Sequence, residues 1–174
     1  MNTKINISCF VSMFLFLTCV NSPSQVCKTA KDLMENSVEA INNKNTEEYI
    51  SLIEFDSVLK VWKGAGKKDN GYNDMADLLT NNKPQVIKMY SISYNMLIGT
   101  LEKIHKLDKW HFELKNFEME SIEEVSSYFF REKYIMKLED DKNNQWTLRV
   151  NLTRFNDCYY ITEPLELNYL SKGW

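Results

Sequence analysis

Hydrophobic residues recur at two different spacings along the chain, and the change comes near Trp110. Between residues 30 and 104 they return every three or four positions, which is the spacing of one face of an α-helix. After residue 110 they alternate with polar residues, which is the spacing of a strand with one buried face. Helices followed by strands predict an α+β fold, with N-terminal helices packed on a curved antiparallel sheet of about four strands.

The helical half contains several start signals. Thr29 and Asp32 have the spacing of a capping box, in which each residue satisfies a backbone N–H of the other. Asn45 can cap a second, shorter helix. Asp74 can cap a further short helix that reaches Leu79. These signals divide the first half into consecutive helices.

The longest predicted helix begins near Pro84, because proline fits the first turn of a helix, and it runs to Ile104. His105 follows it and is expected to be an exposed cap at the carboxyl end. Two other stretches are less regular. The stretch Asp56–Trp62 fits either a helix or a short strand, and the glycine-rich stretch 63–73 predicts a loop.

The second half predicts a meander of four strands. Apolar positions shift phase by one residue at Lys115–Asn116, which is the pattern of a β-bulge that bends a strand. Residues 140–144 have the composition of a turn, and Asn156–Asp157 that of a tight hairpin. The expected inward face of the second strand holds Tyr128, Phe130, Tyr134, Met136 and Leu138. That of the third holds Trp146, Leu148, Val150 and Leu152, and that of the fourth holds Tyr159, Ile161, Leu165 and Leu167.

The first residues form a separate segment. Lys4 precedes an uncharged, mostly apolar run from Ile5 to Val20. The run is shorter and more polar than a membrane-spanning helix, so we expect a signal peptide over residues 1–24 and a single domain over residues 25–174. Two processing routes remain open, cleavage before Gln25 or acylation of Cys19 within a loose lipoprotein box. Either route predicts an exported protein (periplasmic, cell-surface or secreted), and the second predicts a lipid anchor.

Two cysteines, Cys27 and Cys158, lie in the predicted domain. In an oxidising compartment they can form a disulfide between the start of the first helix and the last hairpin, or they can remain free thiols. With His105 and His111 they lack the spacing of a metal site, so no metal or cofactor is expected.

The charged residues exclude one class of partner. The formal net charge is −3, and acidic and basic residues are mixed along the chain. Because the chain has no basic block, its sequence gives no electrostatic support for binding nucleic acid.

The stretch EAINNKNTEEYISLIEF, followed by further helices and a curved meander, resembles the NTF2-like (cystatin-like α+β) superfamily. Asn42–Ile53 is similar to the polar connection of that superfamily, where a second helix carries Tyr49 and Leu52. The resemblance covers roughly Lys28–Leu167, and the helix-rich stretch Asp74–Leu107 is longer than is common there. It implies a bent sheet that wraps the helices into a cone, which can open as a pocket. Members include isomerases and dehydratases with a pocket carboxylate or histidine, and many non-catalytic modules, among them small exported bacterial lipoproteins.

Two glutamates interrupt the expected inward faces, Glu132 in the second strand and Glu163 in the fourth. A carboxylate on a core face costs free energy unless it is paired, and two on one concave surface can act as acid and base. Two structural alternatives remain open. A bulge can turn each residue outward, or Glu132 can pair with Arg149 or Arg154.

These residues define a candidate pocket floor. The predicted ligand-binding residues are Tyr128, Phe130, Glu132, Tyr134, Tyr159 and Glu163. We expect an exported or lipid-anchored domain without enzymatic activity that binds a small apolar ligand or a protein partner. The alternative is a pocket enzyme of the isomerase or dehydratase type that uses Glu132 or Glu163. A homodimer formed through the sheet is a further expectation.

Overall fold

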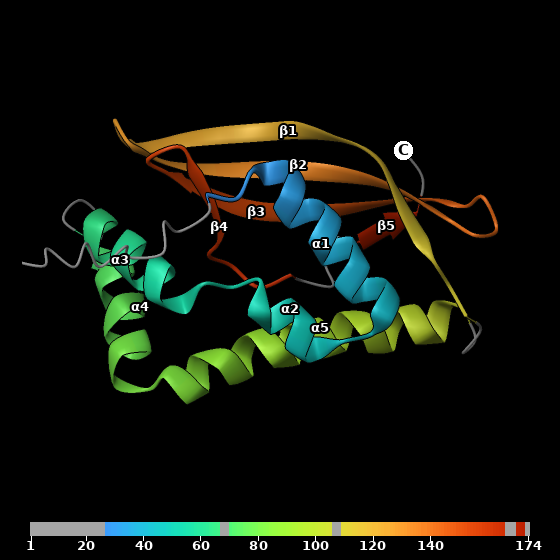
Figure 1. Ribbon diagram of the computed structural model, residues 1–174, viewed down its shortest axis with the longest axis horizontal. Coiled ribbons are helices and arrows are strands. Elements are labelled where there is room, and N and C mark those ends of the chain that lie inside the picture. Colours follow the sequence, from blue (N-terminus) through green and yellow to red (C-terminus); the bar gives the residue numbers. More distant parts are fainter. Residues whose placement is uncertain (1–26, 67–69, 106–108, 166–169, 173–174) are drawn as a thin grey trace, which may run out of the picture.

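A set of helices and an antiparallel sheet make up the computed structural model (Figure 1). It describes residues 27–66, 70–105, 109–165 and 170–172 of the 174-residue chain. The described helices are α1 (Ala30–Asn43), α2 (Thr46–Ser51), α3 (Phe55–Ala65), α4 (Asn70–Asn81) and α5 (Lys83–Ile104). The described strands are β1 (Phe112–Ser126), β2 (Phe129–Asp140), β3 (Gln145–Phe155), β4 (Cys158–Ile161) and β5 (Leu170–Lys172). The predicted α+β class is therefore confirmed.

The sheet is a meander in which β1, β2, β3 and β4 lie side by side in chain order, each antiparallel to the next. This confirms the predicted run of four antiparallel strands, and the three-residue β5 adds a pairing with Trp146–Leu148 of β3. The fourth strand ends at Ile161 and is therefore shorter than the predicted strand, which reached Leu167. Leu165 is buried beyond that end, and Leu167 lies outside the described residues.

The edge strand β1 is irregular along its length. Its register with β2 shifts between Leu114 and Asn116, which places the predicted bulge at Lys115. Two further shifts follow, within Met119–Ser121 and within Glu124–Ser126. Each bulge bends a strand and increases its twist, and Figure 1 shows β1 curving over the neighbouring strands.

The predicted helix starts are confirmed at three places. The Thr29 hydroxyl accepts from the Asp32 N–H at 3.1 Å, and the Asp32 carboxylate accepts from the Thr29 N–H at 2.9 Å. The Asn45 side chain caps α2 by accepting from two backbone N–H groups, each at 3.1 Å. Asn82 caps α5, with Pro84 in its first turn.

The stretch 63–73 is more helical than the predicted loop. α3 continues to Ala65, and α4 already begins at Asn70. A Cβ at Gly66 would collide with the side chain of Asn73, whose Nδ2 donates to the Gly66 carbonyl at 2.9 Å. Gly66 therefore permits the end of α3 to approach the first turn of α4 closely. The glycine-rich composition of residues 63–73 predicts a loop here instead. The undecided stretch Asp56–Trp62 is helical and belongs to α3.

One core joins the helices to the sheet. It includes Leu33, Met34 and Val38 of α1, Tyr94, Leu97 and Leu101 of α5, and Met136, Leu138, Leu148 and Val150 of the sheet. Tyr49 of α2 stacks on Tyr94 with ring centroids 4.6 Å apart, and the Tyr94 hydroxyl donates to the Ala40 carbonyl at 2.6 Å. The Tyr49 oxygen accepts from the Leu165 N–H at 3.0 Å. These tyrosines connect three helices with the segment that follows β4.

The start of β2 differs from the prediction. Tyr128 was expected on the inward face, but it precedes the strand and is 48% exposed. Phe129 is buried instead of Phe130, which is half-buried. The reason is that Phe129 lies opposite Phe155 and packs against Val61 of α3, so a helix covers the outer face at this end of the sheet.

His105 is buried, contrary to the prediction of an exposed cap. Its ring lies among three aromatic side chains, with centroid distances of 5.6 Å to Trp110, 5.9 Å to Phe112 and 5.5 Å to Trp146. The aromatic residues that begin β1 and β3 therefore enclose the end of α5.

The structure joins Cys27 and Cys158 in a disulfide, which links the start of α1 to the first residue of β4. Beside it, the Tyr159 N–H donates to the Lys28 carbonyl at 3.1 Å. The predicted leader, including Cys19, lies outside the described residues. Among the helices that are described, none combines the length and the apolar composition needed to cross a membrane.

Candidate functional site

Two polar clusters lie on the two faces of β2. Arg131 and Glu132 are consecutive in this strand, and consecutive side chains of a strand point to opposite faces. Glu132 points to the face that carries the core residues Tyr134 and Met136. Arg131 points to the outer face, opposite Thr153 of β3.

The inner cluster surrounds Glu132, of which only 1% is exposed. The Arg154 Nε donates to its carboxylate at 2.7 Å, and the Tyr134 hydroxyl donates at 2.6 Å. The Arg154 guanidinium lies 4.1 Å from the ring centre of Phe130. Burial, followed by hydrogen bonds to Glu132 and Tyr159, raises the pKa of Tyr134. The hydrogen bond to Glu132 raises the pKa of Arg154, so this carboxylate faces a permanent cation.

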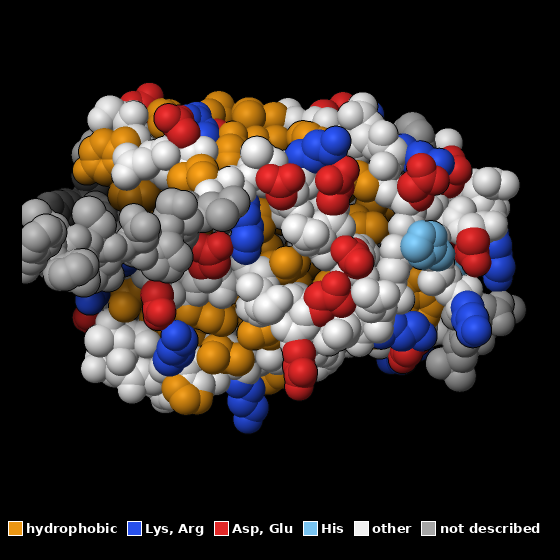
Figure 2. All heavy atoms as spheres, in the orientation of Figure 1, with side chains coloured by type: hydrophobic (Ala, Val, Ile, Leu, Met, Phe, Trp, Pro, Cys, Tyr) orange, Lys and Arg blue, Asp and Glu red, His pale blue; other side chains and the backbone are white. Residues whose placement is uncertain are grey.

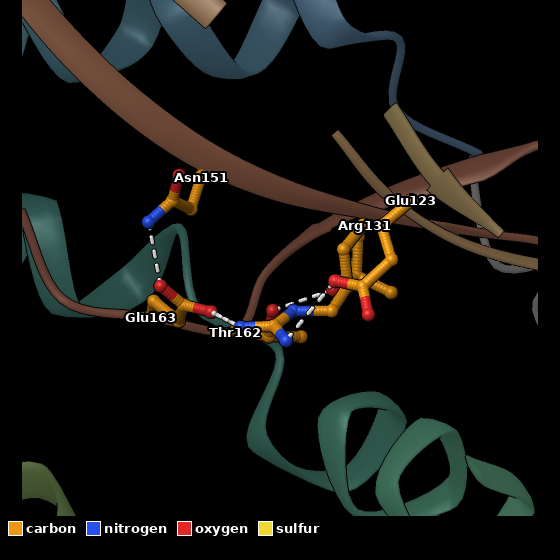
Figure 3. Close-up of polar contacts among 6 residues, drawn as sticks. Glu123, Arg131, Asn151, Thr162 and Glu163 are labelled. Atoms are coloured by element: carbon orange, nitrogen blue, oxygen red, sulfur yellow. Dashed lines mark hydrogen bonds and ion pairs between the residues drawn. The ribbon is translucent and has the colours of Figure 1, made fainter. Parts of the chain in front are cut away.

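The outer cluster surrounds Arg131 (Figure 3). One guanidinium nitrogen donates to Glu163 at 2.8 Å, and the other lies 3.3 Å from Glu123. The second oxygen of Glu163 accepts from the Asn151 side chain at 2.6 Å. The hydrogen bond that Arg131 donates to Glu163 raises the pKa of Arg131. Two carboxylates therefore share one arginine, and the cluster has one excess negative charge.

A pocket of about 290 Å³ opens beside this outer cluster. Arg131, Thr162 and Glu163 line it on the sheet side, and Trp62, Gly71, Tyr72 and Met75 line it on the side of α3 and α4. The Arg131 guanidinium lies 6.0 Å from the ring centre of Tyr72. The pocket therefore has one polar wall and one aromatic and aliphatic wall, and its volume is near the lower end of small-molecule sites.

The predicted pocket floor divides between the two clusters. Glu132, Tyr134 and Tyr159 lie together on the inner face, and Phe130 joins them through Arg154. Glu163 belongs to the outer cluster. Tyr128 belongs to neither, because its ring packs edge-on against Phe155 with centroids 5.7 Å apart.

Among the pockets lined by described residues, the one that touches both Glu132 and Glu163 is a gap of about 10 Å³, which is roughly the space of one water molecule. Of the two predicted arginine partners of Glu132, Arg154 makes the contact, and Arg149 pairs with Glu120 at 3.1 Å. Each glutamate is thus held by an arginine of its own.

The sequence reasoning missed the helical wall of the pocket. Trp62 lies in the stretch whose secondary structure the pattern did not decide, and Tyr72 lies in the stretch predicted as a loop. Tyr72 and Met75 are three residues apart, which places them on one face of a helix. That spacing was a usable signal, but the nearby glycines concealed it. Within the described ranges, no group of histidine, cysteine or carboxylate side chains has a metal-binding arrangement.

Comparison with known proteins adds no assignment, because no protein-family model, no curated protein and no solved structure matches the chain.

Proposed function

We propose that this protein is a non-catalytic binding domain that holds a small, mainly apolar ligand in the pocket between α3, α4 and the outer face of the sheet. The observation that carries this proposal is the pairing of an aromatic and aliphatic wall with a polar wall around a volume of about 290 Å³. Pockets that hold small molecules have this composition, in which apolar walls provide affinity and a few polar groups fix the orientation.

The polar wall indicates which ligands fit. Arg131 already contacts Glu123 and Glu163, so its charge is compensated. The excess negative charge disfavours an anionic ligand and favours a neutral or cationic one. Glu163 accepts hydrogen bonds, and its side chain is 36% exposed, so a donor on the ligand can reach it. We therefore infer an apolar ligand, neutral or cationic, with a hydrogen-bond donor at one end.

A titration with N-phenyl-1-naphthylamine, a neutral apolar fluorophore with one N–H donor, tests this function. We expect saturable binding with a dissociation constant in the micromolar range, which corresponds to a binding free energy on the order of −8 kcal/mol. The substitution Met75→Lys places a charge in the apolar wall and should weaken binding at least about tenfold, which corresponds to 1.4 kcal/mol.

The matched control is Met119→Lys, because Met119 is an exposed methionine of β1 and does not line the pocket. This variant should bind the fluorophore as the unmodified protein does. Thermal unfolding of both variants distinguishes a lost pocket from a lost fold. Equal affinities for both folded variants would reject the pocket.

We also propose that the fold is an NTF2-like cone. The three register shifts of β1 support this proposal, because bulges bend a sheet around the layer it covers. A solved structure in which β1–β3 run flat, without enclosing the core residues of α1 and α5, would contradict it.

Export is the remaining part of the proposal. The disulfide between Cys27 and Cys158 supports it, because disulfides form and persist in oxidising compartments. Mass spectrometry of the mature N-terminus distinguishes the two processing routes. A diacylated Cys19 indicates a lipid anchor, a free Gln25 indicates a secreted protein, and an intact Met1 contradicts both.

A further inference from the structure

The longest helix, α5, is apolar on two opposite faces. Its inner face carries Val86, Tyr90, Tyr94, Leu97 and Leu101, all of them buried. Its outer face exposes Met89, Ile92 and Met96, with exposed fractions of 42%, 48% and 58%. In Figure 2, hydrophobic side chains are visible along the lower edge of the molecule, where α5 runs. A helix that is apolar on both faces is usually covered on both.

The outer residues follow the spacing of a coiled-coil seam. Gln85, Met89, Ile92, Met96, Gly99 and Lys103 are separated by alternating steps of four and three residues. We name this set the α5 stripe. Its positions lie on the side of the helix opposite the core, because residues four and seven apart return to one face.

No contact among the described residues explains Gly99. A Cβ at this position would meet no described atom within 4 Å. A glycine inside a helix nevertheless lowers stability relative to alanine. A small residue among exposed apolar ones is what a closely approaching second helix requires.

We propose that the α5 stripe binds a second copy of the chain, with the two α5 helices antiparallel about a two-fold axis that crosses the exposed side of the helix midway between Ile92 and Met96. Seam positions then meet in complementary pairs. Ile92 packs against the partner's Met96, and the long Met89 fills the space above the partner's Gly99. Gln85 lies beside the partner's Lys103, where its side-chain oxygen can accept a hydrogen bond. Two-fold symmetry repeats each of these pairs.

The flanking charges select this orientation and this partner. In the antiparallel pairing, Lys88 lies beside the partner's Glu102, which already pairs with Lys44 of its own chain at 3.2 Å and would be shared between two lysines. Asn95 lies beside its own copy, and because its side-chain oxygen accepts from Thr46 at 2.8 Å, its amide N–H groups face the copy. A parallel pairing would instead place Lys88 beside Ser93, without a charge pair. Flanking charges of opposite sign set the orientation of paired helices.

The edge strand β1 is a weaker candidate for self-association. It also exposes apolar side chains, Met119 and Ile122. However, four glutamates crowd the same stretch, Glu118, Glu120, Glu123 and Glu124. The first three already pair with Lys137, Arg149 and Arg131 of the sheet, so a copy of β1 docked here would crowd like charges and compete with these ion pairs. The sheet-mediated homodimer is therefore an alternative that sedimentation equilibrium of Met119→Lys can detect.

The expected dimer is weak. A helix of 22 residues is about 33 Å long, and one such contact buries less than the roughly 800 Å² per partner of a standard interface. Sedimentation equilibrium up to about 1 mM protein is therefore the suitable measurement. We expect a monomer–dimer equilibrium that Met96→Lys weakens at least about tenfold.

Two further variants make the test specific. Gly99→Ala should raise the Tm of the dilute monomer by about 2–4 °C, because alanine favours the helix, and should weaken the dimer because the partner's Met89 loses its space. Met119→Lys should leave the dimer unchanged. A monomer at all concentrations, or a dimer that resists Met96→Lys, would overturn the proposal. A dimer lost only in Met119→Lys would assign the contact to β1. None of these results depends on the pocket.

Discussion

Arg154 donates a 2.7 Å hydrogen bond to Glu132, whose carboxylate is almost completely removed from solvent at the inner face of β2. The two side chains come from adjacent strands, and Arg154 lies opposite Phe130, two residues before Glu132. The contact is therefore diagonal across the strand pair, and it neutralises a charge that would otherwise be buried alone.

The first prediction concerns this ion pair. Arg154→Met leaves the buried carboxylate of Glu132 without its cation and should lower the free energy of unfolding by about 2–3 kcal/mol. The cost is below that of a fully buried pair, because 24% of the Arg154 side chain is exposed and water can reach the site. Urea denaturation at neutral pH measures the change.

A double variant and a surface control complete that test. Glu132→Gln combined with Arg154→Met removes both charges but keeps an acceptor for the Tyr134 hydroxyl, so it should regain most of the lost stability. Arg149→Met breaks the exposed pair with Glu120 and should cost less than about 1 kcal/mol. If Arg149→Met and Arg154→Met lower the free energy of unfolding equally, the buried pair contributes no more to stability than the exposed one.

The second prediction concerns the disulfide. Cys27 and Cys158 are 131 positions apart in the sequence, so their bond closes a long loop. Replacing both by serine should lower the free energy of unfolding by about 2–5 kcal/mol. Urea denaturation of this variant, compared with that of the unmodified protein under oxidising and reducing conditions, measures the change. A reductant should destabilise only the unmodified protein, and equal stabilities in oxidant and reductant would count against a structural bond.

The sheet could be predicted from the sequence because its signals are local. Alternation fixes which residues of β3 face inward, and the phase slip at Lys115 identifies the bulge in β1. The capping residues Thr29 and Asn45 act on backbone groups two or three positions away, so their roles can also be read directly.

The pocket could not be predicted in the same way, because it depends on contacts between distant segments. Arg131 and Glu163 are 32 positions apart, and nothing local links them. The helical wall was hidden because glycine suggested a loop, although Gly66 serves a tight corner instead. The sequence predicts that Glu132 and Glu163 share a face, because both interrupt an apolar run. After Ile161, however, the chain leaves β4, and strand alternation no longer fixes the direction of Glu163.

The third prediction is a pH dependence that arises from Asp140. Burial raises the pKa of this carboxyl group, but hydrogen bonds from Trp146, Asn144 and Lys142 outweigh it, so the pKa is lowered in the folded protein. A lowered pKa stabilises the fold above the unfolded value of about 3.9, and this contribution is lost as the pH falls through the folded value. Asp140→Asn should therefore have a lower free energy of unfolding than the unmodified protein at pH 7. It should also lose less of that free energy between pH 5 and pH 3, which urea denaturation of both proteins across this range measures.

The neighbouring residue Asp141 provides the control for that pH dependence. It is exposed, so Asp141→Asn should change neither the stability at neutral pH nor its decline in acid by a measurable amount. If Asp140→Asn and the unmodified protein lose stability in parallel as the solution is acidified, the hydrogen bonds at the turn do not hold the carboxylate form.

The last prediction compares two glycines, Gly66 at the end of α3 and Gly99 inside α5. Gly66→Ala forces a Cβ into the space of the Asn73 side chain and displaces its hydrogen bond to the Gly66 carbonyl, so it should lower the free energy of unfolding by about 0.5–1.5 kcal/mol. Gly99→Ala meets no described atom within 4 Å and lies inside α5, so in dilute monomer it should raise that free energy by about 0.5–1 kcal/mol. Thermal unfolding at low protein concentration measures both. Opposite signs are the expected result, because a helix interior favours alanine at any open position, whereas a Cβ at Gly66 displaces the Asn73 side chain that donates to the Gly66 carbonyl. Two changes of the same sign would mean that the corner is not as close as the contact between Gly66 and Asn73 indicates.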